Sequence, residues 1–160
     1  MTLEQALRAA AVPPFHAMAM ARRASELEAA GRSIRHLEVG QPGAGAPAAA
    51  RAAVAAAMES GSSLGYTNAP GLPTLRRRIA QHYSERNGVE VDHDAVLIVA
   101  GASAGFTLSF LAAFDPGDRV GVIEPGYPCY RNTLVALGVE PVPIAVGPET
   151  RWAPTGMCDT

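Results

Sequence analysis

The sequence predicts an α/β fold, an α/β/α arrangement with a mostly parallel sheet, preceded by an N-terminal helical arm. Residues 96–100 form a continuous apolar run, which is typical of a strand covered on both faces. A helical stretch and a second apolar strand over 120–123 follow, and together they make a βαβ unit of about 30 residues. A further helix and a strand over 139–146 extend the same alternation.

The N-terminal part of the chain is predicted to form two helices. A short helical stretch over 3–10 ends at the prolines 13–14, and apolar residues at helical spacing predict a second helix from Phe15 to about Ala30. Gly31 is placed to end that helix. A strand-like segment over 34–39 follows.

Loops rich in glycine and proline separate the next two helices. The glycines and prolines of residues 40–47 exclude a helix or a strand there. The high alanine content of residues 47–59 predicts a helix that is ordered but thinly packed. Residues 61–71 form a second loop. The next helix ends near Asn87-Gly88, and its predicted buried stripe consists of Leu72, Leu75, Ile79, His82 and Tyr83. Its arginine cluster, Arg76, Arg77 and Arg78, is interpreted as a solvated face.

The C-terminal half supplies the predicted sheet. The apolar run 96–100 is followed by a loop of small residues over 101–105 and then by a helix that ends at Phe114. Residues 115–118, Asp-Pro-Gly-Asp, predict a turn. A loop over 124–130 leads to a helix over 130–137, which Gly138 ends. Two prolines in the last strand, Pro141 and Pro143, cannot donate to a ladder and therefore place that strand near an edge of the sheet.

Composition excludes several kinds of chemistry. All 13 basic residues are arginine and none is lysine, so this chain cannot supply an ε-amino group for Schiff-base catalysis. The net charge of -2, with no long basic run, argues against nucleic-acid partners and against a polybasic membrane surface. The two cysteines and the absence of a visible targeting or membrane-spanning segment predict a cytoplasmic protein.

The loop after residue 100 is the first candidate binding site. A strand, a loop of small residues and a helix in that order direct free backbone N–H groups and the positive end of the helix dipole at one point. Such a point suits a phosphate, and the Ser103 hydroxyl either bonds that phosphate or caps the helix.

Other side chains carry weaker signals. Tyr127 follows a strand at the edge where parallel sheets bind ligands, and its ring either stacks on a planar ligand or packs beneath the loop. Tyr66, in a loop, is interpreted on the residues alone as half-buried. The histidines show no metal spacing and no triad is present, so they are predicted to be structural or surface residues: His16, His36, His82 and His93.

Four segments share their order and spacing with one enzyme family. They are Tyr66–Arg76, Val99–Ala104, Asp115–Asp118 and Glu124–Tyr130. In these motifs, from about Pro14 to Pro154, the chain resembles class I/II aminotransferases, which depend on pyridoxal 5'-phosphate (PLP) and have fold type I. The resemblance implies an incomplete fold type I large domain.

The resemblance also implies roles for six residues. Ala102, Ser103 and Ala104 match the loop that holds the cofactor phosphate, and Tyr127 matches the aromatic residue that stacks on the pyridine ring. Tyr66 matches the tyrosine that reaches the phosphate of the neighbouring subunit in a homodimer. Gly40 matches the glycine whose backbone meets the substrate carboxylate. After Pro42 the chain departs from the family pattern, since an acidic residue and an aromatic commonly follow and here Gly43 and Ala44 stand.

The remaining family residues have no match here. The asparagine facing the ring, the aspartate at the pyridine nitrogen, the Schiff-base lysine and the arginine that clamps the substrate carboxylate lie farther along the family's chain. No catalytic residue is therefore assigned in this chain. Residues 156–160 do not continue the family pattern, which suggests a truncation or frameshift near 155. The expected domains are an arm with part of the small domain over 1–45 and the first part of the PLP-binding domain over 46–155.

Two functions fit these features. The first is amino transfer from an amino acid to a 2-oxo acid, with this chain as an N-terminal portion that is inactive alone. The second is a non-catalytic module that binds a phosphate-bearing ligand or dimerises. An unrelated nucleotide-binding domain is disfavoured because the spaced glycines of the dinucleotide fingerprint are absent.

Overall fold

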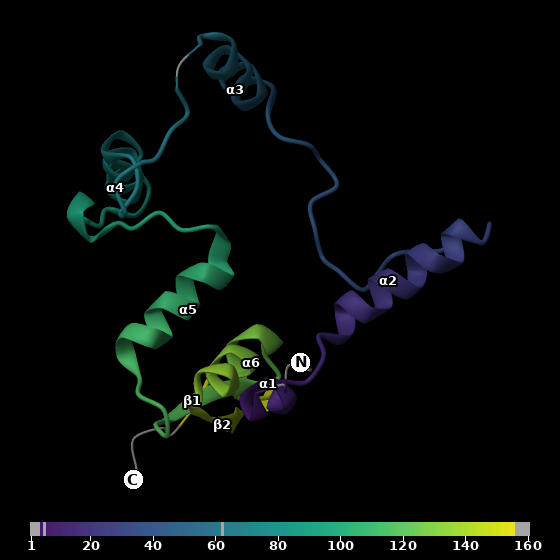
Figure 1. Cartoon of the computed structure of the whole chain (residues 1–160). Helices are drawn as coiled ribbons and strands as arrows, with labels where there is room; N and C mark the ends of the chain where they lie inside the picture. The colour runs from purple at the N-terminus through teal and green to yellow at the C-terminus, as the bar shows by residue number, and fades with distance from the viewer. Residues whose placement is uncertain (1–3, 5, 62, 156–160) are drawn as a thin grey trace. The chain divides into compact units, whose positions relative to one another are not determined.

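The chain is described by a computed structural model, which covers residues 4, 6–61 and 63–155 (Figure 1). It divides into two compact units. One unit comprises residues 1–38 and 100–160, and the other comprises residues 39–99. The predicted atypical tail, 156–160, lies outside the described residues. No helix in the described ranges is long and apolar enough to span a membrane.

The first unit begins with α1 (Leu7–Ala11) and α2 (His16–Ala29). Both lie where helices were predicted, although α1 begins at Leu7 and the predicted start at residue 3 lies outside the described residues. Gly31 at φ +83° adopts the left-handed conformation that ends α2. The predicted strand over 34–39 is wrong. The backbone N–H and C=O groups of a strand pair with those of a neighbouring strand, and no strand of the described residues pairs with this segment.

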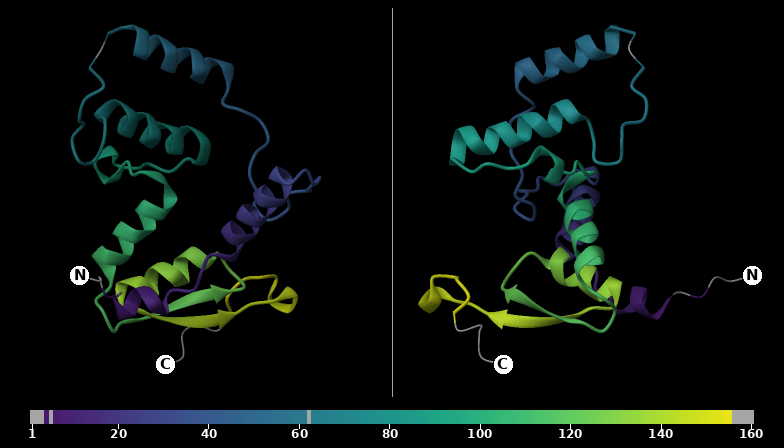
Figure 2. Two further views of the ribbon diagram at one scale, coloured as in Figure 1. Left: turned by 45° about the vertical axis from the view of Figure 1, so that its right-hand side comes forward. Right: turned by 90° about the vertical axis from the view of Figure 1, so that its left-hand side faces the viewer.

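A parallel pair of strands forms the sheet of this unit. β1 (Arg119–Glu124) and β2 (Glu140–Ala145) pair in register from Arg119 opposite Glu140 to Glu124 opposite Ala145. The crossover helix α6 (Pro128–Leu137) packs against β2, as Figure 2 shows. This β1–α6–β2 unit confirms both predicted strands and the helix between them.

The turn before β1 is also confirmed. Gly117 adopts φ +98°, and the Asp118 N–H donates to the Asp115 carbonyl at 3.1 Å. The Gly117 N–H donates to the carbonyl of Gly138, the residue that ends α6, at 2.8 Å. The turn that enters β1 is therefore held against the turn that enters β2.

The core of this unit is small. Leu134 of α6 is 1% exposed, and Val139 and Val146 flank β2 as buried residues. α6 thus covers the sheet through one fully buried leucine. The helix α5 (Gly101–Ala113) packs against α6, and it leaves Leu108 and Leu111 exposed.

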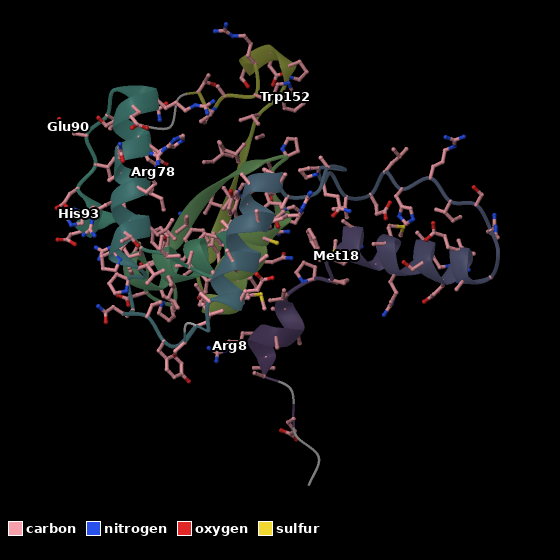
Figure 3. The ribbon with its side chains drawn as sticks, turned by 90° about the horizontal axis from the view of Figure 1, so that it is seen from above. Arg8, Met18, Arg78, Glu90, His93 and Trp152 are labelled. Carbon is pink, nitrogen blue, oxygen red and sulfur yellow. The ribbon has the colours of Figure 1, made fainter. Side chains whose placement is uncertain are left out.

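The second unit contains α3 (Ala48–Glu59), α4 (Pro73–Asn87) and the short 3₁₀ helix η1 (His93–Ala95). α3 buries no residue, which confirms the predicted thin packing. Gly88 ends α4 in the left-handed conformation, as predicted. Figure 3 shows Arg78 on α4, with Glu90 and His93 on the segment after it.

Two predictions for α4 are wrong. The expected buried stripe is largely exposed: Leu72, Leu75, His82 and Tyr83 all face outward. An apolar stripe is buried only where another element covers it, and none of the described residues does so. The expected solvated arginine face is wrong for Arg76, which is 9% exposed, whereas Arg77 and Arg78 are exposed.

The predicted strand over 96–100 is also corrected. These residues form no ladder, and Leu97 is 65% exposed rather than covered on both faces. The Ile98 N–H instead donates to the Pro70 carbonyl at 3.0 Å. The βαβ unit predicted over 96–123 is therefore replaced by β1–α6–β2, because no strand in the described residues pairs with the apolar run.

Candidate functional site

The N-terminus of α5 is an open cluster of hydrogen-bond donors. The helix starts at Gly101, whose φ of +84° favours glycine, so Ala102 and Ser103 lie in its first turn. The prediction of a loop of small residues over 101–105 is therefore wrong. Amides in the first turn have no acceptor within the helix. In the described chain no other backbone carbonyl accepts from the amides of Ala102 and Ser103.

Ser103 does not cap α5. The capping position belongs to Ala100, and Ser103 is the third residue of the helix. Its carbonyl accepts a hydrogen bond from the Thr107 hydroxyl at 2.7 Å, and its side chain is exposed. The interpretation of Ser103 as an N-cap is therefore wrong. Its hydroxyl is available beside the free amides, where the helix dipole favours an anion.

Tyr127 occupies the N-cap position of α6, immediately after the loop that leaves β1. Its ring meets Phe15 at a centroid distance of 6.2 Å and Tyr130 at 5.5 Å, both nearly perpendicular. The side chain is 47% exposed, so these contacts hold the ring without burying it. Hydrogen bonding to the neighbouring Cys129 thiol raises the pKa of the Tyr127 hydroxyl.

Several cavities adjoin α6. One, of about 530 Å³, is lined by Tyr127, Phe15 and Arg131, among others. Another, of about 410 Å³, is lined by Ser103 and Cys129, among others. Asn132 lines both cavities. The structure therefore brings Ser103 and Tyr127, which are 24 positions apart in sequence, to adjoining hollows of one unit.

The other two predicted site residues lie in the second unit. Tyr66 is fully exposed, so the interpretation of a half-buried tyrosine is wrong, and its ring is free for contacts outside its own unit. Gly40 lies in an open loop, where an added Cβ would meet no atom within 4 Å. The structure does not place either residue in the hollows that border α6.

A histidine between two carboxylates lies at the end of the first unit. His36 Nδ1 is 2.7 Å from Glu38 Oε1, and its Nε2 is 3.0 Å from Glu28 Oε1. Hydrogen bonding to Glu38, and then to Glu28, raises the pKa of His36. Among the described residues, no group of three or more His, Cys, Asp or Glu side chains could hold a metal ion.

Comparison with known proteins decides the family. The model of aminotransferase class I and II matches residues 34–155. The chain belongs to the class I and II aminotransferase family. This confirms the resemblance that the four sequence motifs indicated.

Individual aminotransferases show the same relationship. The chain is 52% identical over 157 residues to a valine–pyruvate aminotransferase of Mycobacterium tuberculosis, a match that covers 98% of this chain and 40% of that protein. A crystal structure of an aminotransferase from the same organism has a TM-score of 0.89 at 51% identity, over 96% of this chain and 39% of that one. An alanine aminotransferase from Pyrococcus furiosus has a TM-score of 0.83 at 30% identity, over 93% and 38%. These neighbours confirm the fold type I class, and the chain spans about 40% of the length of the relatives it matches.

The sequence motifs did not indicate one group of residues, the aromatic neighbours of Tyr127. Phe15 and Tyr130 both contact the Tyr127 ring. The spacing of Tyr127 and Tyr130, three positions apart at the start of a helix, was the available signal, because such residues share one helix face. No local signal indicates the contact of Phe15, which comes from a distant part of the chain.

Proposed function

We propose that this chain forms the part of a PLP-dependent aminotransferase that holds the cofactor phosphate and contacts the cofactor ring. The enzyme would transfer an amino group from an amino acid to a 2-oxo acid. The observation that carries this proposal is the donor cluster at the start of α5, which lies in the same unit as the half-exposed Tyr127 ring.

The residues present fit the phosphate of PLP. Backbone amides of Ala102, Ser103 and Ala104 and the Ser103 hydroxyl are donors at the positive end of a helix dipole, and a phosphate is an anion that needs such donors. When bound, PLP acts as an electron sink for the amino-acid substrate. Tyr127 would lie against the cofactor ring and orient it.

Two further residues complete the proposed site. Gly40 would present its backbone to the substrate carboxylate, and Tyr66 would reach the phosphate held by a second subunit. The full exposure of Tyr66 supports this role, because none of the described residues of its unit covers the ring. A homodimer is part of this proposal, as are a cytoplasmic location and the assignment of residues 46–155 to the large domain.

The bond to the cofactor must come from other residues. No lysine occurs among the 160 residues, so this chain has no side-chain amine to bond the cofactor carbonyl. Its own residues would bind and orient the cofactor and exclude water from one side of it. We expect the chain alone to bind PLP but not to catalyse transamination.

A chimera tests the proposal. This chain replaces the matching 157-residue segment of the M. tuberculosis valine–pyruvate aminotransferase, and amino transfer from valine to pyruvate is measured. The chimera should be active. Ser103→Ala should weaken PLP binding roughly tenfold, because a charge-assisted hydrogen bond is lost.

Ser109 provides the control. It lies on the same helix, and its hydroxyl bonds the Gly105 carbonyl at 3.0 Å, away from the free amides. Ser109→Ala should leave PLP binding unchanged. Equal affinities in the two variants would contradict the phosphate site at Ser103.

The absence of lysine also favours a second candidate, a non-catalytic module that binds a phosphate-bearing ligand. An inactive chimera that still folds, together with phosphate binding by the chain alone, would select this module over the enzyme.

A further inference from the structure

A continuous series of ring contacts crosses the first unit. We name it the aromatic ladder, and it consists of Phe15, Tyr127, Tyr130, Phe106, Phe110 and Phe114. Successive centroids lie between 5.1 and 6.2 Å apart, within the range in which aromatic pairs attract. The ladder runs from the segment before α2, through the start of α6, and along α5.

Tyr130 is the link between the two halves of the ladder. Its ring is 5.5 Å from Tyr127 at an interplanar angle of 84°, and 5.1 Å from Phe106 at 77°. Both contacts have the perpendicular geometry that the aromatic quadrupole favours. No other described residue makes ring contacts with both Tyr127 and a residue of α5.

The position of Tyr130 is itself fixed. Leu134, one turn later on the same face of α6, is 1% exposed and anchors the helix on the sheet. The Tyr130 N–H donates to the Tyr127 carbonyl at 3.2 Å, which ties the two backbones together. The Tyr130 ring therefore projects from an anchored helix.

Phe106 connects the ladder to the phosphate donors. It follows Ser103 by three positions on α5, so the two share a helix face, and both line the cavity of about 410 Å³. Ser103 at one end and Tyr127 at the other are thus separated by only two rings, Phe106 and Tyr130.

We propose that Tyr130 is a positioning residue that sets the Tyr127 ring relative to the start of α5. The phosphate of one bound cofactor can then reach the donors at the start of α5 while its ring lies against Tyr127. This inference rests on the proposed function, since it assumes that both ends touch the same ligand. It gives Tyr130 no contact with the cofactor.

The ring and not the hydroxyl carries this role. None of the described residues exchanges a hydrogen bond with the Tyr130 hydroxyl, and its contacts with Tyr127 and Phe106 are ring to ring. Tyr130→Phe should therefore retain the function, and Tyr130→Leu should lose it while keeping an apolar side chain.

The test uses the full chain and pyridoxine 5'-phosphate. This ligand has an alcohol in place of the aldehyde of PLP and therefore cannot form a Schiff base with an amine. Affinity comes from titration, and the induced circular dichroism of the ligand at saturation reports the orientation of its ring. Tyr130→Leu should weaken binding roughly two- to tenfold, the range of one aromatic pair, and lower the dichroism for each bound ligand. Tyr130→Phe should match the wild type.

Two further measurements separate positioning from damage to the fold. Phe114→Leu removes the last ring of the ladder, whose single ring contact among the described residues is with Phe110, and should change neither affinity nor dichroism. Inorganic phosphate, which needs only the α5 donors, should bind Tyr130→Leu and the wild type equally.

The outcomes distinguish this inference from the proposed function. Wild-type dichroism and affinity in Tyr130→Leu would overturn the positioning role alone. An equal loss in Phe114→Leu, or a loss of inorganic phosphate binding in Tyr130→Leu, would also overturn it, because the effect would then be on the fold. A wild-type chain that binds no pyridoxine 5'-phosphate would overturn both proposals.

Discussion

Arg76 is bound to Asp94 across the second unit, with its Nη2 2.8 Å from Asp94 Oδ1. Its Nε also donates to the Val96 carbonyl at 2.8 Å. Arg76 is 9% exposed although its neighbours Arg77 and Arg78 are exposed. One arginine of the cluster therefore joins α4 to η1 and the segment after it.

Removing this arginine should destabilise the second unit. Arg76→Met keeps much of the buried stem but leaves the Val96 carbonyl without its donor, a loss of about 1–3 kcal/mol. Arg77→Met, on the exposed face, should stay within about 0.5 kcal/mol of the wild type. Chemical denaturation of both variants measures the difference. Asp94→Asn should cost less than Arg76→Met, because Asp94 is 71% exposed and solvent screens the ion pair. A larger loss in Asp94→Asn would contradict this view of the pair.

Gly71 should tolerate no side chain. It has φ +99°, and an added Cβ would lie 2.5 Å from Ile98 Cγ1. Gly71→Ala should therefore cost more than about 1 kcal/mol, since steric overlap adds to backbone strain. Gly88→Ala is the matched control, because Gly88 also has positive φ but open space around it. Thermal unfolding should give Gly71→Ala a lower Tm than Gly88→Ala. Equal costs at the two glycines would show that the contact with Ile98 is unimportant.

His36 should titrate above its ordinary pKa of 6.5, because Glu38 and then Glu28 stabilise the imidazolium by hydrogen bonding. Its contribution to stability is present below pH 6.5 and is lost as pH rises through the raised pKa. Hydrogen bonding to His36 lowers the pKa of Glu38 from 4.5, so the Glu38 contribution is lost only as pH falls through that lowered value. NMR titration should show that Glu38→Gln moves the His36 pKa toward 6.5 more than Glu28→Gln does. Unchanged titration in both variants would rule out the two contacts.

The prolines of β2 should limit pairing at the edge of that strand that faces away from β1. The N–H groups of Glu140 and Val146 donate to the β1-side carbonyls of Asp118 and Glu124. Successive backbone N–H groups along a strand point to alternate edges, so positions 141 and 143, both proline, face the edge away from β1. Replacing both prolines with threonine would expose N–H donors there and should increase self-association, which sedimentation measures. Val142→Thr is the control, because its N–H already faces β1. Equal association in the two proteins would refute the blocking role.

Local signals in the sequence predicted much of the fold. The ends of α2, α4 and α6 were placed correctly because Gly31, Gly88 and Gly138 each adopt a positive φ that favours glycine. The turn before β1 was predicted for the same kind of reason, since proline and glycine restrict the backbone at their own positions. The sequence also indicated free amides at the start of a helix after residue 100, but it placed the small residues 101–105 in a loop before that helix, whereas α5 begins at Gly101.

The sequence by itself thus determined where most helices and turns begin and end, and which residues form an open helix N-terminus and a tyrosine-bearing loop. The tertiary structure decided which segments find partners. Residues 96–100 form no strand, Arg76 is buried, and Tyr130 connects Tyr127 to α5. Backbone conformation depends on the residue itself and its neighbours, whereas pairing and burial depend on what distant segments supply.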